Sequence, residues 1–145
     1  MLAQILSGAT SMPVLQVKDK MQMEPNHVYV IPPNTEMTIR NGALALQPRK
    51  RDGYLPKPID AFFHSLAENQ KGQAISVILT GTGSDGAEGT KAIRNFGGIT
   101  FVQTPSSAAH DSMPTRAIAS TDIDFVLTTR EIALEITKIS HRTIG

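Results

Sequence analysis

One segment, residues 75–86, restricts the possible fold more than any other part of the sequence. It opens with Ile75-Ser-Val-Ile-Leu79, four apolar residues interrupted by a single serine. Such a run predicts a strand buried on both faces, as strands are in parallel sheets. Three glycines follow, the last of them Gly86, and glycine lets the backbone turn sharply because it has no Cβ. Asp85 is the only ionisable residue of this turn, at a strand end where open α/β sheets place their chemistry.

From residue 58 onward the sequence alternates between helical and strand patterns. Predicted helices start at Pro58 and Gly86, and predicted strands cover residues 75–79, 99–103 and 125–127. This order predicts an α/β fold, a mostly parallel sheet flanked by helices on both faces in a Rossmann-like, three-layer arrangement. In the first half, Asn41-Gly42 joins two strand-like segments and predicts an antiparallel β-hairpin excursion from that sheet.

Composition narrows the classes of protein to which the chain can belong. Its 145 residues fit about one domain, which can bury roughly 68–70% of its unfolded surface. The net charge of +1 gives no reason to expect nucleic acid as a partner, and the absence of cysteine excludes disulfides and thiolate metal sites. No apolar run approaches the roughly 20 residues that cross a bilayer. We therefore expect a cytoplasmic protein with no membrane insertion.

The glycines of the turn also match the dinucleotide-binding pattern Gly-x-Gly-x-x-Gly, at positions 81, 83 and 86. That site needs an acidic residue at the end of the next strand, where this chain has Gln103. Asp85 would also place a carboxylate inside the phosphate loop. We expect no nucleotide and no other cofactor or metal.

A second hypothesis is a nucleophile elbow. The segment Thr82-Gly-Ser-Asp-Gly86 resembles G-x-S-x-G with Ser84 as the nucleophile, although threonine replaces the first glycine. Ser84 would need a histidine as its base, and His110, in the loop after the next strand, has the only plausible position. The remaining histidines are expected to be structural and partly exposed: His27, His64 and His141.

A third hypothesis makes Asp85 the orienting carboxylate of a catalytic triad. Such a carboxylate fixes the tautomer of a histidine, while backbone N–H groups beside it form part of an oxyanion hole. In the structural alternative, Asp85 caps the following helix and the glycines only form the turn. The spacing of the residues leaves both interpretations open.

Several segments between Met12 and Ile139 resemble, in the same order, those of one family. They are Asn26-His-Val-Tyr-Val-Ile-Pro-Pro33, Ile59-Asp-Ala-Phe-Phe-His-Ser-Leu66, Leu79-Thr-Gly-Thr-Gly-Ser-Asp-Gly-Ala-Glu-Gly89, Gly97-Gly98, Gln103, Ala108-Ala109 and Ser112-Met-Pro-Thr-Arg-Ala117. Together they are similar to the C-terminal catalytic domain of the chemotaxis receptor methylesterases (CheB type).

This resemblance implies a hydrolase of bacterial chemotaxis and signal transduction, with a Ser-His-Asp triad on a parallel α/β sheet. The family hydrolyses glutamyl methyl esters on chemoreceptors, some members deamidate receptor glutamines, and the cytoplasmic receptor helices are the partners. Asp85 falls on the triad carboxylate. Thr82 falls on the position whose backbone N–H helps to form the oxyanion hole.

The family's serine and histidine lie upstream of the region that residues 1–11 match. We therefore expect residues 1–145 to be a single methylesterase-like domain, incomplete at its N-terminus, with no receiver domain and no activity alone. The chain would be either a fragment of a longer protein or a degenerate member of the family. A sheet that lacks a strand exposes apolar surface, which favours self-association. The alternatives are a serine hydrolase that uses Ser84, or a non-enzymatic receptor-interaction or scaffold domain, in which Arg49-Lys-Arg51 could contact an acidic partner.

Overall fold

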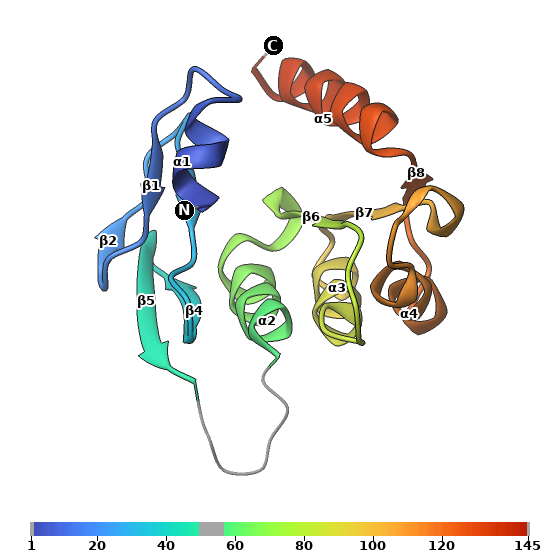
Figure 1. Cartoon of the computed structure of the whole chain (residues 1–145), viewed down its shortest axis with the longest axis horizontal. Helices are drawn as coiled ribbons and strands as arrows, with labels where there is room; N and C mark the ends of the chain where they lie inside the picture. Colours follow the sequence, from blue (N-terminus) through green and yellow to red (C-terminus); the bar gives the residue numbers. More distant parts are fainter. Residues whose placement is uncertain (1, 50–56, 145) are drawn as a thin grey trace.

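The structure is a computed structural model that describes residues 2–49 and 57–144. Its N-terminal part holds one short helix and five strands (Figure 1). In chain order they are α1 (Leu2–Ser7), β1 (Val14–Gln16), β2 (Met21–Gln22), β3 (Val28–Val30), β4 (Thr35–Arg40) and β5 (Ala43–Pro48). β1 pairs with β3 in parallel, whereas β2, β5 and β4 form an antiparallel sheet.

The C-terminal part alternates helices and parallel strands, as the sequence predicts. It comprises α2 (Pro58–Gln70), the short 3₁₀ helix η1 (Lys71–Gln73), β6 (Ile75–Ile78), α3 (Ala87–Asn95), β7 (Ile99–Gln103), the 3₁₀ helix η2 (Pro105–Ser107), α4 (Ser112–Ser120), β8 (Phe125–Leu127) and α5 (Thr129–Ile144). The strands pair in the order β6-β7-β8. Helices α2, α3 and α4 lie on one face of this sheet and α5 lies on the other, which gives three layers (Figure 1).

The predicted fold class is therefore confirmed, and so is the hairpin. Asn41 and Gly42 both adopt positive φ, 52° and 78°, between β4 and β5. The described strands nevertheless divide into three separate sheets where the sequence suggested one parallel sheet with an excursion.

The core of the C-terminal part forms between the sheet and its three covering helices. Ile78, Val102 and Ala117 are buried together there, with Ile59 and Phe63 of α2 packed against them. A second core joins the antiparallel sheet to the outer side of α2 and includes Ile39 and Leu44, each 1% exposed. Helix α2 thus ties the two parts of the molecule together.

The prediction that the strand starting at Ile75 is buried on both faces is only half right. Ser76 and Ile78 are buried, but Ile75 and Val77 are partly exposed, and Leu79 is 45% exposed beyond the end of the strand. The physical reason is that side chains alternate between faces, and Ile75 and Val77 lie on the face that α5 covers, where α5 packs mainly against β7 and β8. In addition, β6 pairs only with β7 within the described chain, so that its other edge is open. An edge strand in an otherwise buried parallel sheet leaves apolar side chains uncovered.

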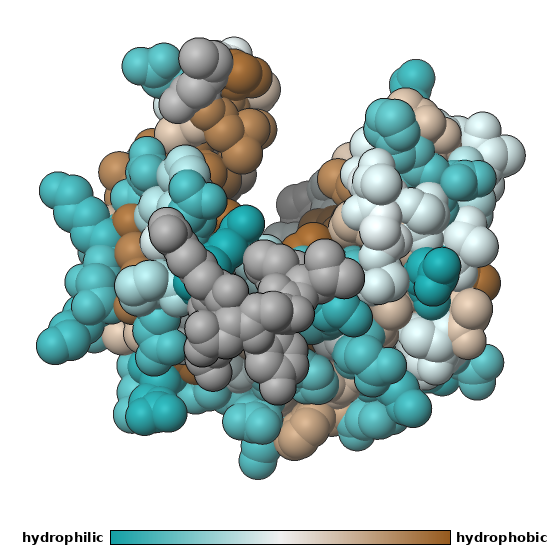
Figure 2. All heavy atoms as spheres, turned by 60° about the horizontal axis from the view of Figure 1, so that its bottom comes forward, coloured by the Kyte–Doolittle hydropathy of each residue, from teal (hydrophilic) through white to brown (hydrophobic). Residues whose placement is uncertain are grey.

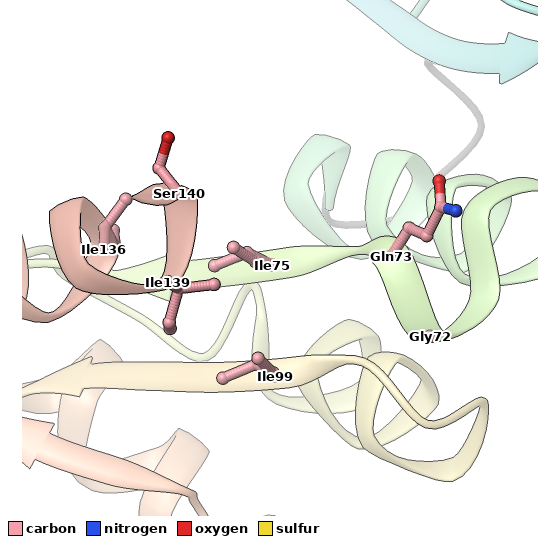
Figure 3. A pocket seen from close by; sticks show the side chains of 7 residues that line it. All are labelled: Gly72, Gln73, Ile75, Ile99, Ile136, Ile139 and Ser140. Carbon is pink, nitrogen blue, oxygen red and sulfur yellow. The ribbon is translucent and has the colours of Figure 1, made fainter. Parts of the chain in front are cut away.

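A cavity of about 590 Å³ lies beside this open strand. Figure 3 shows Ile75 and Ile99 at the start of β6 and β7, with Ile136 and Ile139 of α5 on the other side of the space. The remaining lining residues are Gly72, Gln73 and Ser140. In the space-filling view, the molecule is hollowed between its N-terminal and C-terminal parts, and hydrophobic side chains gather in and beside the hollow (Figure 2).

Among the described residues, no helix has the length and apolar character needed to span a membrane. The basic segment Arg49–Arg51 lies mostly outside the described residues. Arg49 itself is described, and its Nε donates a hydrogen bond to the Thr35 carbonyl at 3.4 Å.

Candidate active site

The turn that follows β6 is fixed at its first residues by the chain that follows β7. The side-chain Oε1 of Gln103, at the end of β7, accepts the Thr80 N–H at 2.9 Å. The Gly81 N–H donates to the His110 carbonyl at 2.9 Å, and the Gly81 carbonyl accepts the Met113 N–H at 3.1 Å. These bonds fix the backbone conformation of residues 80 and 81 at the carboxyl edge of the sheet.

The Asp85 carboxylate lies at the N-terminus of α2, which precedes it in the chain. Its Oδ2 accepts the Ile59 N–H and its Oδ1 accepts the Asp60 N–H, both at 2.9 Å. Pro58, in the first turn, has no N–H, so these two are the first backbone donors of the helix. The interpretation that Asp85 caps the following helix is therefore wrong, because its hydrogen bonds go to α2.

Asp60 supplies the cap that α3 lacks in its own sequence. Its Oδ1 accepts the Gly86 N–H at 3.0 Å and the Gly89 N–H at 2.7 Å. Asp60 is 6% exposed, and its Oδ2 has no hydrogen-bond partner among the described residues. Asp60, in the first turn of α2, thus caps α3. Asp85, which precedes α3, in turn caps α2.

The pKa of Asp60 is raised, chiefly because burial disfavours the charged form. The Asp85 carboxylate raises this pKa further, whereas the N–H groups of Gly89 and Gly86 and the charge of Lys57 lower it. The hydrogen bonds therefore do not fully compensate the carboxylate for its loss of water.

Two glycines make this close approach of α2 and α3 possible. A Cβ at Gly89 would stand 2.5 Å from the Phe63 Cβ and 3.1 Å from the Asp60 Cα. Gly86 has a φ of +100°, and a Cβ there would meet the Ile78 Cδ1 at 2.6 Å. Glycine is needed at the first position for helix packing and at the second for both backbone conformation and space.

The Thr82 N–H lies between two anchored neighbours. The Gly83 N–H donates to Ser112 Oγ at 2.9 Å, and the Ser112 hydroxyl donates to the Gly81 carbonyl at 3.2 Å. Thr82 is exposed, and no group of the described chain accepts its N–H. A backbone donor that is held in position and left free for a ligand is what an oxyanion hole requires.

Ser84 and His110 are not hydrogen-bonded to each other in the structure. His110 takes part through its backbone, since its N–H donates to Thr80 Oγ1 at 2.8 Å. Across residues 2–49 and 57–140, no histidine ring is hydrogen-bonded to the hydroxyl of Ser84. His27 contacts Glu24 and stacks on Tyr29, His64 is exposed, and the side chain of His141 lies outside the described residues.

The N-terminus of α3 is not available to a phosphate group. Its Gly86 and Gly89 N–H groups are already bonded to Asp60, and the carboxylates of Asp60 and Asp85 would repel an anion. The geometry therefore argues against a nucleotide in this turn. The described residues also contain no group of three or more histidine, aspartate or glutamate side chains placed to hold a metal ion.

Sequence reasoning missed Asp60, Gln103 and Ser112 as parts of this site. Asp60 lies in the first turn of α2, between apolar residues in the sequence. An acidic residue in the first turn of a helix normally faces water and stabilises the helix. The one available signal was position: Gln103 is the last residue of a predicted strand, and Ser112 lies in the segment that follows this strand, as the turn itself follows β6. Their partners could not be read from the sequence because the bonds join residues 23 to 31 positions apart.

Comparisons with known proteins point to one family. The sequence model of the CheB methylesterase family matches residues 1–136. The chain is 32% identical over 142 residues to "Protein-glutamate methylesterase/protein-glutamine glutaminase 2" of Burkholderia pseudomallei (strain 1710b), which covers 97% of the chain and 42% of the relative. It is 43% identical over 126 residues to a 104.1 kDa protein of Rhodobacter capsulatus, over 87% of the chain and 13% of the relative.

The fold is similar to the crystal structure of the Thermotoga maritima CheB methylesterase catalytic domain, with a TM-score of 0.82 and 25% sequence identity. The match covers 95% of this chain and 75% of that domain. The chain thus spans less than half of the Burkholderia and Rhodobacter relatives and three quarters of the solved domain. From the family match and the shared fold, we conclude that this chain belongs to the CheB methylesterase family.

Proposed function

We propose that residues 1–145 form part of a single protein-glutamate methylesterase domain of bacterial chemotaxis. The complete domain hydrolyses glutamyl methyl esters on the cytoplasmic helices of methylated chemoreceptors. Deamidation of receptor glutamines is a second candidate reaction, supported by the name of the Burkholderia relative. The protein works in the cytoplasm, where these helices lie. The observation that carries the proposal is the Asp85 carboxylate, held at the carboxyl end of β6 within the family's fold.

Asp85 would act as the orienting carboxylate of the triad. Each of its oxygens already accepts one backbone N–H from α2, and each keeps a second acceptor position for an imidazole N–H. The N-terminus of α2 also favours a negative charge at this place. An ionised carboxylate held in this way can fix the histidine tautomer and stabilise the imidazolium that forms during acyl transfer.

Thr82 would act through its backbone. In ester hydrolysis the carbonyl oxygen gains negative charge in the tetrahedral intermediate, and a fixed N–H donor stabilises that charge. The anchoring of Gly81 and Gly83 by Ser112 keeps the Thr82 N–H in place before the substrate arrives. Because the donor belongs to the main chain, the threonine side chain itself is not required.

Residues 1–145 alone are expected to have no esterase activity above background. Asp85 needs a histidine to orient, and no histidine ring bonds to it in the part of the chain that the structure describes. The check is to incubate the chain with a methylated receptor fragment and to measure methanol release. Turnover that Asp85→Asn abolishes would contradict this expectation, and turnover that Ser84→Ala abolishes would favour the serine hydrolase that uses Ser84.

A chimera tests the proposed role directly. The N-terminal quarter of the Thermotoga catalytic domain would be joined to residues 1–145, and methanol release from a methylated receptor fragment would be measured. Asp85→Asn should lower kcat by about 10⁴-fold, as loss of a triad carboxylate does. Thr82→Pro, which removes the N–H, should lower kcat by about 10²–10³-fold, whereas Thr82→Ala should change it little.

The matched control for Asp85→Asn is Asp124→Asn, since Asp124 also accepts backbone and side-chain hydrogen bonds but lies at the other end of the sheet. An active chimera in which Asp85→Asn and Asp124→Asn have equal effects would refute the triad role of Asp85. A folded but inactive chimera that still binds receptor helices would favour the interaction or scaffold domain.

We also propose that a second copy of the chain covers the open edge of β6. The cavity of about 590 Å³ and the exposed Leu79 are apolar surface that water solvates poorly. Light scattering should therefore give a mass that rises with concentration. Ile136→Asp, inside the cavity, should shift the protein toward monomer, whereas Leu134→Asp, on a residue of α5 outside the cavity lining, should not. A monomer at high concentration would refute the proposal.

A further inference from the structure

The carboxylate of Asp60 has more structural consequence than an ordinary helix cap. Its Oδ1 accepts two backbone N–H groups at the start of α3, those of Gly86 and Gly89. Gly86 directly follows Asp85, so these bonds fix the chain immediately beside the Asp85 side chain. The Asp60 N–H in turn donates to Asp85 Oδ1 at 2.9 Å. Asp60 is therefore linked to Asp85 in two ways. Its carboxylate binds the backbone that follows Asp85, and its backbone N–H binds the Asp85 carboxylate.

The environment of Asp60 also costs stability that a simple cap would avoid. Asp60 is 6% exposed, and its Oδ2 has no partner among the described residues. A buried acceptor without a hydrogen bond is unfavourable, and such groups in native structures call for an explanation. A serine or threonine could cap α3 without burying a carboxylate. A buried acid at this position fits a role in holding a neighbouring group in place.

The glycines show how tightly this arrangement is built. A Cβ at Gly89 would lie 3.2 Å from Asp60 Oδ1, and one at Gly86 would lie 3.3 Å from Ile59 Cγ2. The first turn of α2 and the turn before α3 thus pack directly on each other. A shift of Asp60 would move Gly86, and a shift of Gly86 would reorient the carboxylate that precedes it.

We propose that Asp60 is a positioning residue of the active site, which sets the orientation of the Asp85 carboxylate by fixing the Gly86 and Gly89 N–H groups. Asp60 and Asp85 act as one coupled unit across α2 and α3. The catalytic consequence of this coupling rests on the proposed function of Asp85, but the coupling itself can be tested without any enzyme activity.

The test is amide hydrogen exchange, measured by NMR on the whole 145-residue chain. The informative amide is that of Ile59, because it bonds to Asp85 and not to Asp60. In Asp60→Ala, the protection of the Ile59 amide should fall about tenfold relative to that of Val102, whose amide in the core of the sheet reports global unfolding. Asp60→Asn keeps an Oδ1 acceptor and should restore most of the protection.

Asp124→Asn is the matched control, since Asp124 also accepts backbone hydrogen bonds and lies away from the turn. It should leave the Ile59 amide unchanged relative to Val102. If Asp60→Ala exposes the Gly86 and Gly89 amides but leaves Ile59 protected, the two caps are independent and the proposal is overturned.

If Asp60→Ala does not fold, Asp85→Ala answers the same question, because coupling between two sites is reciprocal. The amide of Gly89, which bonds only to Asp60, should then lose about tenfold of its protection. Unchanged protection of Gly89 would overturn the proposal. A chimera without esterase activity would remove the catalytic role of Asp85 but would not alter either exchange result.

Discussion

Carboxylates stand at both ends of the β6-β7-β8 sheet, and the two ends use them differently. At the amino end, Asp124 accepts the Thr100 N–H at 2.8 Å, the Thr100 hydroxyl at 2.9 Å and Arg94 Nη1 at 2.7 Å. Burial works to raise the pKa of Asp124, but the bonds from Thr100 and Arg94 outweigh it and lower that pKa. This carboxylate has a cation and donors for both of its oxygens.

At the carboxyl end, Asp60 and Asp85 receive backbone N–H groups but no side-chain cation within hydrogen-bonding distance among the described residues. Asp60 is more deeply buried than Asp124, keeps one oxygen without a partner and has a raised pKa. The carboxylate at the amino end is thus fully hydrogen-bonded and stabilises the fold. The carboxyl end contains a buried carboxylate with one unbonded oxygen, which lowers stability, at the place where the family's chemistry is expected.

The largest effect should come from forcing apart the two helices that exchange caps. Gly89→Ala places a Cβ 2.5 Å from the Phe63 Cβ and close to the backbone of Asp60. Because neither neighbour can move without shifting α2, we expect a loss of about 2–3 kcal/mol in the free energy of unfolding. Urea denaturation would measure this loss.

The control is Gly72→Ala in η1, where the nearest heavy atom lies 3.6 Å from the new Cβ, an ordinary van der Waals distance. This change should cost less than about 1 kcal/mol. If the two alanine variants are equally stable, the close packing of α2 on α3 does not limit the stability of the carboxyl end.

Much of the fold could be predicted from the sequence because its signals are local. The strand at Ile99–Gln103, the hairpin at Asn41-Gly42 and the proline start of α2 all follow from short-range pattern and backbone preference. The cap of α5 is also local, because the Glu131 N–H donates to Thr128 Oγ1, three residues earlier, at 3.3 Å.

The site was only partly accessible to sequence reasoning, because its bonds join distant segments. Asp85 could be singled out from its place after a strand, but its partners lie 25 and 26 residues away on α2. The role of Asp60 depends on the angle at which α2 meets α3, which no local pattern encodes. The residues of β6 themselves do not mark it as an edge strand, since a buried strand and an edge strand can share one apolar sequence. Only the family resemblance, through the strand expected to be missing, pointed to an open edge.

The pH dependence of stability should separate the two ends. The pKa of Asp124 is lowered in the folded state, so its stabilisation is complete above the unfolded-state value of about 4 and is lost as the pH falls through the folded-state value. Asp124→Asn should therefore cost about 1–2 kcal/mol at pH 7, with the smaller figure favoured by partial exposure, and less at pH 3.

Asp60 should behave in the opposite way. Its folded-state pKa is raised by burial and by Asp85, against the opposing charge of Lys57, so the folded state binds more protons than the unfolded state above about pH 4. Wild-type stability attributable to Asp60 then falls as the pH rises through the folded-state value. The free energy of unfolding of Asp60→Asn, relative to wild type, should rise from pH 3 to pH 7. If the unfolding free energies of the Asp60 and Asp124 variants, each relative to wild type, change with pH in the same direction, the two ends of the sheet do not differ in this way.

The smallest effects should come from two serines beside the turn. Ser112→Ala removes the acceptor of the Gly83 N–H and the donor to the Gly81 carbonyl, which should cost about 1 kcal/mol. Ser84→Ala removes a hydroxyl that has no hydrogen-bond partner within the described chain, so its cost should stay below about 0.5 kcal/mol. Paired urea titrations would compare them. A larger loss for Ser84→Ala would mean that the turn depends on its own hydroxyl, and that the anchoring of the Thr82 N–H by Ser112 is not what stabilises the carboxyl end.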